Sequence, residues 1–248
     1  MIKTDMPAEE YHGIKNAISA SLIKMARNKT LAHVYDAMIN PKEPSEAMRF
    51  GTIMHTAVLE PGLFDEQYMV MPEGLDRRTK EGKETWAAIV ATGKQCLTAE
   101  KFETVKRIME SVHNSRFWQL IEASNPIIEA SIIQKSADGL ALKVRADIII
   151  LPCENFPQGA VIDFKTTSDA SPEGFGRQVY KLGYHVQAAF YTQIVQKEYG
   201  MESRPPFYLL AAETSAPFLT APYMVTDEQI MMGDSEIQEI MPELVDAF

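Results

Sequence analysis

The sequence predicts a mixed α/β domain with a central mixed sheet flanked by helices. In the first half of the chain, apolar residues recur at helical spacing. Between residues 127 and 166, three runs rich in Ile and Val are separated by turn-forming residues, which is typical of consecutive strands. A helical pattern, two more strand-like runs and a last helical pattern follow. Helices and strands mixed in this order favour one sheet packed between helices.

Residues 11–125 are expected to be mostly helical. Helical patterns cover 18–28, 33–40 and 45–61, and a serine stands at the expected N-cap of the first (Ser19 or Ser21) and the third (Ser45). Residues 72–95 are polar and charged, and we expect an exposed loop that leads into a helix. A further helix is expected over 98–115.

Strands are expected over 127–134, 140–151 and 160–166, with a turn at Ala137, Asp138 and Gly139 joining the first two into a hairpin. A helix over 174–199, strands over 207–214 and 218–225 and a helix over 226–245 complete the prediction. We therefore expect a single domain spanning residues 1–248. Its parts are a helical N-terminal part (about 11–125), a catalytic sheet and helix (about 126–226) and an acidic C-terminal helix (about 227–246).

The charge of the chain is uneven. The net charge is −10, yet beyond Arg204 the sequence holds eight of its 34 acidic residues and none of its 24 basic ones. The overall charge argues against a general nucleic-acid binder. The chain up to Arg204 is nearly neutral, however, so a local basic groove is still possible there. The acidic end is either a solvated helix face or a surface that repels stray DNA or docks a partner.

Composition also limits location and cofactors. The sequence contains no stretch of about 18 apolar residues, so we expect no membrane-spanning helix. The acidic, proline-containing N-terminus does not resemble a signal peptide. Two cysteines, Cys96 and Cys153, cannot supply the four thiolates of an iron–sulfur cluster. We expect a protein of the cytoplasm with no membrane contact and no iron–sulfur cluster.

Charged residues interrupt two of the apolar strands. Asp147 lies in the second strand, and Asp163 and Lys165 lie two residues apart in the third. Alternate strand residues share a face, so Asp163 and Lys165 emerge together. Buried charges are costly unless they are paired or bind a metal, so we expect either a salt bridge or a metal site.

Two weaker patterns lie on helices. His55 follows Gly51 by four residues, and the glycine is expected to let another element approach closely. Gln187 and Tyr191 are also four residues apart and share a helix face. Taken alone, His55 is an ordinary core histidine, and Gln187 and Tyr191 are helix packing.

In the order GxxxH, Asp, DxK and QxxxY, these patterns resemble the PD-(D/E)XK nuclease superfamily, and within it the RecB-type branch. The segments FGTIMHTAVLEP and GYHVQAAFYTQ are similar to the nuclease domain of exonuclease VIII and its phage-borne relatives. The resemblance covers about Tyr11 to Thr226 and implies a restriction-endonuclease-like core. The chain departs from the motif at Ala146, where the superfamily has proline.

The resemblance implies a site for Mg²⁺ or Mn²⁺ at His55, Asp147, Asp163 and the backbone carbonyl of Phe164. It also implies that Lys165 orients the attacking water or stabilises developing negative charge. Further candidates are Glu129, which lies behind the metal ligands or contacts a metal-bound water, or else faces solvent, and Gln187 and Tyr191, which hold the substrate strand or brace the site.

The same resemblance implies a 5′-to-3′ exonuclease that acts on ends of double-stranded DNA and leaves 3′ single-stranded tails for a strand-annealing recombinase. We expect a 5′-phosphate pocket at Ser19, Ser21 and Lys24, and DNA contacts at Arg77 and Arg78. A homo-oligomeric ring, most simply a tetramer, is expected. The alternatives are an endonuclease or single-strand-specific nuclease of the same fold, and a non-catalytic DNA-binding relative.

Overall fold

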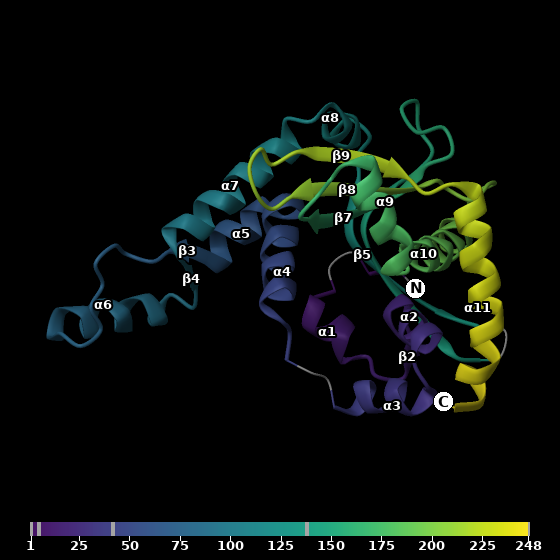
Figure 1. The fold of residues 1–248 in the computed structure, drawn as a ribbon, viewed down its shortest axis with the longest axis horizontal. Helices are drawn as coiled ribbons and strands as arrows, with labels where there is room; N and C mark the ends of the chain where they lie inside the picture. The colour runs from purple at the N-terminus through teal and green to yellow at the C-terminus, as the bar shows by residue number, and fades with distance from the viewer. Residues whose placement is uncertain (1, 4–5, 41–42, 137–138, 248) are drawn as a thin grey trace.

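A mixed sheet lies at the centre of the molecule, between two layers of helices (Figure 1). The computed structural model describes residues 2–3, 6–40, 43–136 and 139–247. The sheet order is β1-β5-β6-β7-β8-β9, and β2 pairs in parallel with β6. All other neighbours are antiparallel except β7 and β8, which are parallel. The strands are β1 (Ile2–Lys3), β2 (Ala17–Ile18), β5 (Ile127–Lys135), β6 (Ala141–Ile150), β7 (Ala160–Thr167), β8 (Phe207–Glu213) and β9 (Thr220–Met224).

Each face of the sheet packs on its own apolar cluster. The first cluster joins the sheet to α2 (Ala20–Asn28), α3 (Leu31–Ile39), α9 (Pro172–Lys181), α10 (Tyr184–Tyr199) and α11 (Asp227–Ala247). The second joins the other face to α4 (Glu46–Leu59), α5 (Pro61–Gln67), α7 (Ala99–His113) and α8 (Arg116–Glu122). Full burial of one Ile or Phe side chain contributes about 1.5–3 kcal/mol. These two clusters therefore hold the helix layers in place. The short helix α1 (Ala8–Gly13) lies near α2 (Figure 1).

An arm projects from the body beyond α5 and α7, at the left of Figure 1. It contains two short parallel strands, β3 (Tyr68–Val70) and β4 (Gln95–Leu97), and the helix α6 (Lys80–Ala91). The side chain of Thr79 accepts a hydrogen bond from the backbone N–H of Gly82 and caps α6. The expected loop followed by a helix within 72–95 is confirmed.

The five expected strands are confirmed to within two residues. β5 and β6 are antiparallel, as the predicted hairpin requires. Two residues of its expected turn, Ala137 and Asp138, lie outside the described residues. Ser45 caps α4 by accepting a hydrogen bond from the N–H of Met48, whereas Ser19 stands at the N-cap of α2 without such a bond.

The prediction of a single helix over 174–199 is wrong. The chain forms two helices, α9 and α10, because Gly183 between them adopts a left-handed backbone with φ of 67°. The short elements β1, β2, β3, β4, α1, α5 and α8 carry no clear periodic signal and were not expected. No helix among the described residues is both long and apolar enough to cross a bilayer.

Two acids of the C-terminal helix α11 are tied to the body. Asp234 pairs with Arg204 at 2.6 Å, and Glu236 pairs with Arg27 of α2 at 2.7 Å. The backbone at Gly233 lies so close to α10 that a Cβ there would come within 2.5 Å of the carbonyl oxygen of His185. The acidic helix is therefore packed on α10 and α2, with only part of its acids facing solvent.

Candidate active site

The site lies where two neighbouring strands separate. β6 and β7 pair between residues 148–150 and 160–162, and that register, if continued, would set Asp147 opposite Asp163. Instead, the Asp147 carboxylate accepts a hydrogen bond of 2.7 Å from the backbone N–H of Phe164. A side chain thus takes the place of the next ladder bond, and the opening between the strands holds both aspartates.

Glu129 enters the site from β5 on the other side of β6. The register pairs on either side place Glu129 opposite Asp147. Glu129 has φ of 52°, a left-handed conformation that costs a residue other than glycine about 1–3 kcal/mol. Strand alternation is broken there, because Ile128 packs on the second cluster and Ala130 on the first. The Glu129 carboxylate meets the Arg145 guanidinium at 2.5 Å.

His55 reaches the cluster of Glu129 and Asp147 from α4, in the helix layer that packs on the second apolar cluster. Its Nδ1 lies 3.5 Å from Oδ2 of Asp147, and its ring meets the ring of Phe164 edge-on at 5.3 Å between centroids. One ligand atom each from His55, Glu129 and Asp147 lies within 4.8 Å of the others. The expected role of Gly51 is wrong, since a Cβ added there would meet no atom within 4 Å.

Burial sets the protonation of this cluster. Burial and the neighbouring Asp163 together raise the pKa of Asp147 to about 8, and burial and the neighbouring Asp147 together raise the pKa of Glu129 to about 7. Burial and the charge of Lys165 lower the pKa of His55, so the imidazole is neutral at pH 7. Two carboxyl groups held together out of water and a neutral imidazole form a donor set that suits a divalent cation.

Asp163 is held beside this cluster by two other partners. One oxygen forms an ion pair with Lys165, and Oδ1 accepts a hydrogen bond of 2.7 Å from Nε2 of Gln187. The salt bridge that the sequence left open is therefore present. Asp163 does not belong to the three-residue group of His55, Glu129 and Asp147.

Lys165 keeps its charge in this setting. Burial alone would lower its pKa, but the carboxylates of Asp163 and Asp147 outweigh burial and raise it above the usual range. Its Nζ also lies 5.3 Å from the ring centroid of Tyr184, which is a favourable place for a cation. A half-buried, charged ammonium is thus positioned next to the cluster.

Gln187 and Tyr191 share a face of α10, as expected, but only Gln187 contacts a predicted site residue. Burial raises the pKa of Tyr191 well above its ordinary value of 10. Its ring meets Phe207 edge-on, with 6.3 Å between centroids. This contact is that of a brace between α10 and β8.

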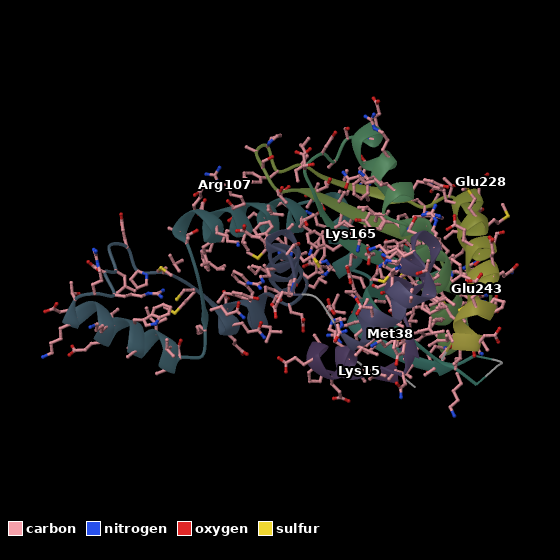
Figure 2. All side chains as sticks on the ribbon, turned by 60° about the horizontal axis from the view of Figure 1, so that its bottom comes forward. Lys15, Met38, Arg107, Lys165, Glu228 and Glu243 are labelled. Atoms are coloured by element: carbon pink, nitrogen blue, oxygen red, sulfur yellow. The ribbon has the colours of Figure 1, made fainter. Side chains whose placement is uncertain are left out.

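The residues expected to contact DNA fall into two separate places. Ser19 and Ser21 lie at the start of α2, and Ser21 is exposed. Arg77 and Arg78 lie on the arm, far from Lys165, which Figure 2 shows in the body. The guanidinium of Arg77 stacks 3.3 Å from the ring centroid of Trp86, and Arg78 is paired with Asp76.

Arg145 and Tyr184 were missed in the sequence, although both contact the site. Arg145 lies two residues before Asp147, and its guanidinium also donates to the carbonyl of Met6 and the hydroxyl of Ser131. Tyr184 lies three residues before Gln187 on α10. The only sequence signal for Arg145 or Tyr184 is its spacing from a residue of the motif. That spacing does not predict which side chains each residue contacts in the folded protein.

Comparisons with known proteins bear on the family and the fold of the chain. The model of the PDDEXK-like domain of unknown function (DUF3799) matches residues 19–247. No curated protein matches. Among solved structures, a protein described as a putative exonuclease from Eubacterium rectale superposes with a TM-score of 0.68 at 17% identity, covering 98% of this chain and 86% of its own. A second structure, of SSO0001, has a TM-score of 0.32 at 15% identity over 77% of this chain and 86% of its own, and this likeness carries no argument.

The family match and the superposition confirm the expected PD-(D/E)XK, restriction-endonuclease-like core. The family model spans nearly the whole chain, from the start of α2 to the end of α11. The chain therefore belongs to the family of PDDEXK-like domains of unknown function.

Proposed function

We propose that this protein is a nuclease that hydrolyses DNA with a divalent cation. One observation carries the proposal: the cluster of half-buried His55 and Glu129 and buried Asp147 lies beside the Asp163–Lys165 pair, in the opening between β6 and β7. A structural ion pair would explain Asp163 and Lys165 but not two further carboxyl groups with raised pKa values.

His55, Glu129 and Asp147 would hold the cation, Mg²⁺ or Mn²⁺, and Asp163 and the carbonyl of Phe164 are proposed as further ligands. The backbone of Phe164 lies at the site, since its N–H donates a hydrogen bond of 2.7 Å to the Asp147 carboxylate. When bound, such a cation supplies Lewis acidity toward the phosphodiester and favours ionisation of the attacking water.

Lys165 stabilises the negative charge that develops on the phosphate. Lys165 is half-buried, so its charge is only partly screened by water. Asp163 holds the ammonium in place before substrate arrives. Gln187 in turn holds Asp163, and Tyr191 braces α10 behind it.

We further propose 5′-to-3′ action on ends of double-stranded DNA, which leaves 3′ tails for a strand-annealing recombinase. The order of the motifs and the described activity of the superposed Eubacterium rectale protein support an exonuclease. The start of α2, with Ser19 and Ser21, is proposed to receive the 5′-phosphate, and the arm with Arg77 and Arg78 to contact the duplex beyond it.

The decisive experiment is digestion of a linear duplex labelled separately at each 5′ and 3′ end, with Mg²⁺, with Mn²⁺ and with EDTA. We expect release of nucleotides from the 5′ label only, and no cleavage in EDTA. Asp147→Asn should abolish cleavage, while Asp65→Asn on the exposed surface of α5 should cleave as the wild type does. Cleavage of closed circles shows an endonuclease, preference for single strands shows the other alternative, and equal cleavage by Asp147→Asn refutes the proposed site.

A further inference from the structure

Lys24 reaches the site from α2, and its partner there is not a carboxylate. Its Nζ donates a hydrogen bond of 3.1 Å to Oε1 of Gln187. The Nε2 of Gln187 donates to Oδ1 of Asp163 at 2.7 Å, and the other oxygen of Asp163 pairs with Lys165. A continuous series of contacts thus runs from α2 through α10 to β7.

The chemistry of these groups permits one orientation of the Gln187 amide. An ammonium only donates hydrogen bonds and a carboxylate only accepts them, so the amide oxygen must face Lys24 and the amide NH₂ must face Asp163. A flipped amide would set NH₂ against ammonium and oxygen against carboxylate. Because Gln187 is buried, water does not compensate for either lost bond. The ammonium of Lys24 and the carboxylate of Asp163 therefore require the same orientation of the Gln187 amide, and Lys24 holds its oxygen end.

The break between α9 and α10 makes this contact possible. A Cβ on Gly183 would lie 3.0 Å from both Cγ and Cδ of Lys24, and the φ of 67° at Gly183 is itself unfavourable for other residues. The stem of Lys24 therefore packs against bare backbone. Gly183 also starts α10, since its carbonyl accepts the backbone N–H of Gln187 at 3.2 Å. One glycine thus positions both members of the Lys24–Gln187 contact.

We propose that Lys24 is a positioning residue, which orients the amide of Gln187 so that Gln187 holds Asp163 and, through it, Lys165. This inference rests on the proposed nuclease function and deepens it. It replaces the expectation that Lys24 binds a 5′-phosphate, because its ammonium is turned to an internal partner. Ser19 and Ser21, five and three residues earlier in the chain, keep their proposed role.

A double-mutant cycle of Lys24→Met, Gln187→Leu and the double variant tests the proposal. We expect Lys24→Met to lower kcat by about tenfold or more, since misplaced groups slow the chemical step. The double variant should be no slower than Gln187→Leu, because Lys24 acts only through Gln187. Lys15→Met, at an exposed lysine of the segment before α2, is the matched control and should leave kcat unchanged. If Lys24→Met does not fold, Lys24→Gln, which is uncharged and too short for this contact, should show the same loss.

Two results would overturn the proposal. One is multiplication of the two single effects in the double variant. The other is a raised KM in Lys24→Met together with a weaker salt dependence of DNA binding. A slope of log affinity against log salt that is smaller than in the wild type by about one marks the loss of a phosphate contact. Lys24→Arg keeps a donor and a charge, and we expect it to recover part of the lost kcat.

A second measurement needs neither metal nor DNA. In ¹⁵N-labelled metal-free protein, the side-chain amide of Gln187 is assigned by its absence in Gln187→Leu. We expect its hydrogen exchange to be slow in the wild type and faster by about tenfold or more in Lys24→Met. Unchanged exchange in Lys24→Met would overturn the role of Lys24. If the wild type cleaves no DNA, the proposed function fails, and the exchange measurement still decides the role of Lys24.

Discussion

Replacing Asp147 by Asn should stabilise the metal-free protein, and the gain should grow with pH. In the folded state burial raises the pKa of Asp147 to about 8, against 3.8 in the absence of structure. Between these values the folded state binds a proton that the unfolded state has lost, so the wild type loses stability as pH rises. Asn cannot ionise, and its amide oxygen can still accept the N–H of Phe164.

The size of the effect follows from the pKa values. Each pH unit between them costs the wild type about 1.4 kcal/mol, so the difference between Asp147→Asn and wild type should change by up to about 4 kcal/mol from pH 4 to pH 7. The carboxyl is only 10% exposed, so solvent screening removes little of this. The stabilisation is absent below about pH 4, where both states hold the proton.

Urea unfolding followed by tryptophan fluorescence in EDTA measures the free energy of unfolding of both proteins at several pH values. Asp65→Asn, the same substitution at an exposed carboxyl of α5, is the matched control. A difference between Asp147→Asn and wild type that stays constant from acid to neutral pH would refute the reasoning. Adding Mn²⁺ should then stabilise the wild type but not Asp147→Asn, because only the ionised carboxylate binds the cation.

Four further outcomes are expected. Mn²⁺ affinity measured by calorimetry should rise with pH toward about 8, because Asp147 and Glu129 must lose protons to bind, and a flat profile would contradict these pKa values. Lys165→Ala should bind Mn²⁺ by calorimetry yet cleave DNA about a hundredfold more slowly, whereas near-normal rates would remove Lys165 from the chemistry. His55→Ala should lose Mn²⁺ binding and cleavage together, while a lower melting temperature with normal cleavage would mark a core histidine. Light scattering should give about four times 27.8 kDa if the proposed ring forms, with exposed Met231 and Met232 of α11 as candidate contacts, and a monomer that digests processively would exclude the ring.

The sequence alone determined the strands and the pairs of residues that share a face. Strand periodicity and turn residues are local, so the runs of Ile and Val located β5, β6 and β7 closely. The spacing of Asp163 and Lys165 likewise required them to emerge together, and the structure shows them as an ion pair. The four-residue spacing of Gln187 and Tyr191 gave their shared helix face in the same way.

The structure decided what depends on long-range packing. The left-handed backbone of Glu129 breaks the alternation of side chains along β5, and the pairing of β6 with β7 ends before Asp147. Neither feature leaves a periodic signal in the sequence. Gly183 ends a helical pattern that otherwise continues, because its place against the stem of Lys24 requires bare backbone.

The protonation of the site was also decided by tertiary structure. A carboxyl group in a sequence has its ordinary pKa, and only its removal from water beside other carboxyl groups raises the pKa of Asp147 and Glu129. His55 joins them from a helix layer on the other face of the sheet, more than seventy residues earlier in the chain. The residue types were readable from the sequence, but their convergence and desolvation, which make the chemistry possible, come from the packing of two helix layers around one divided sheet.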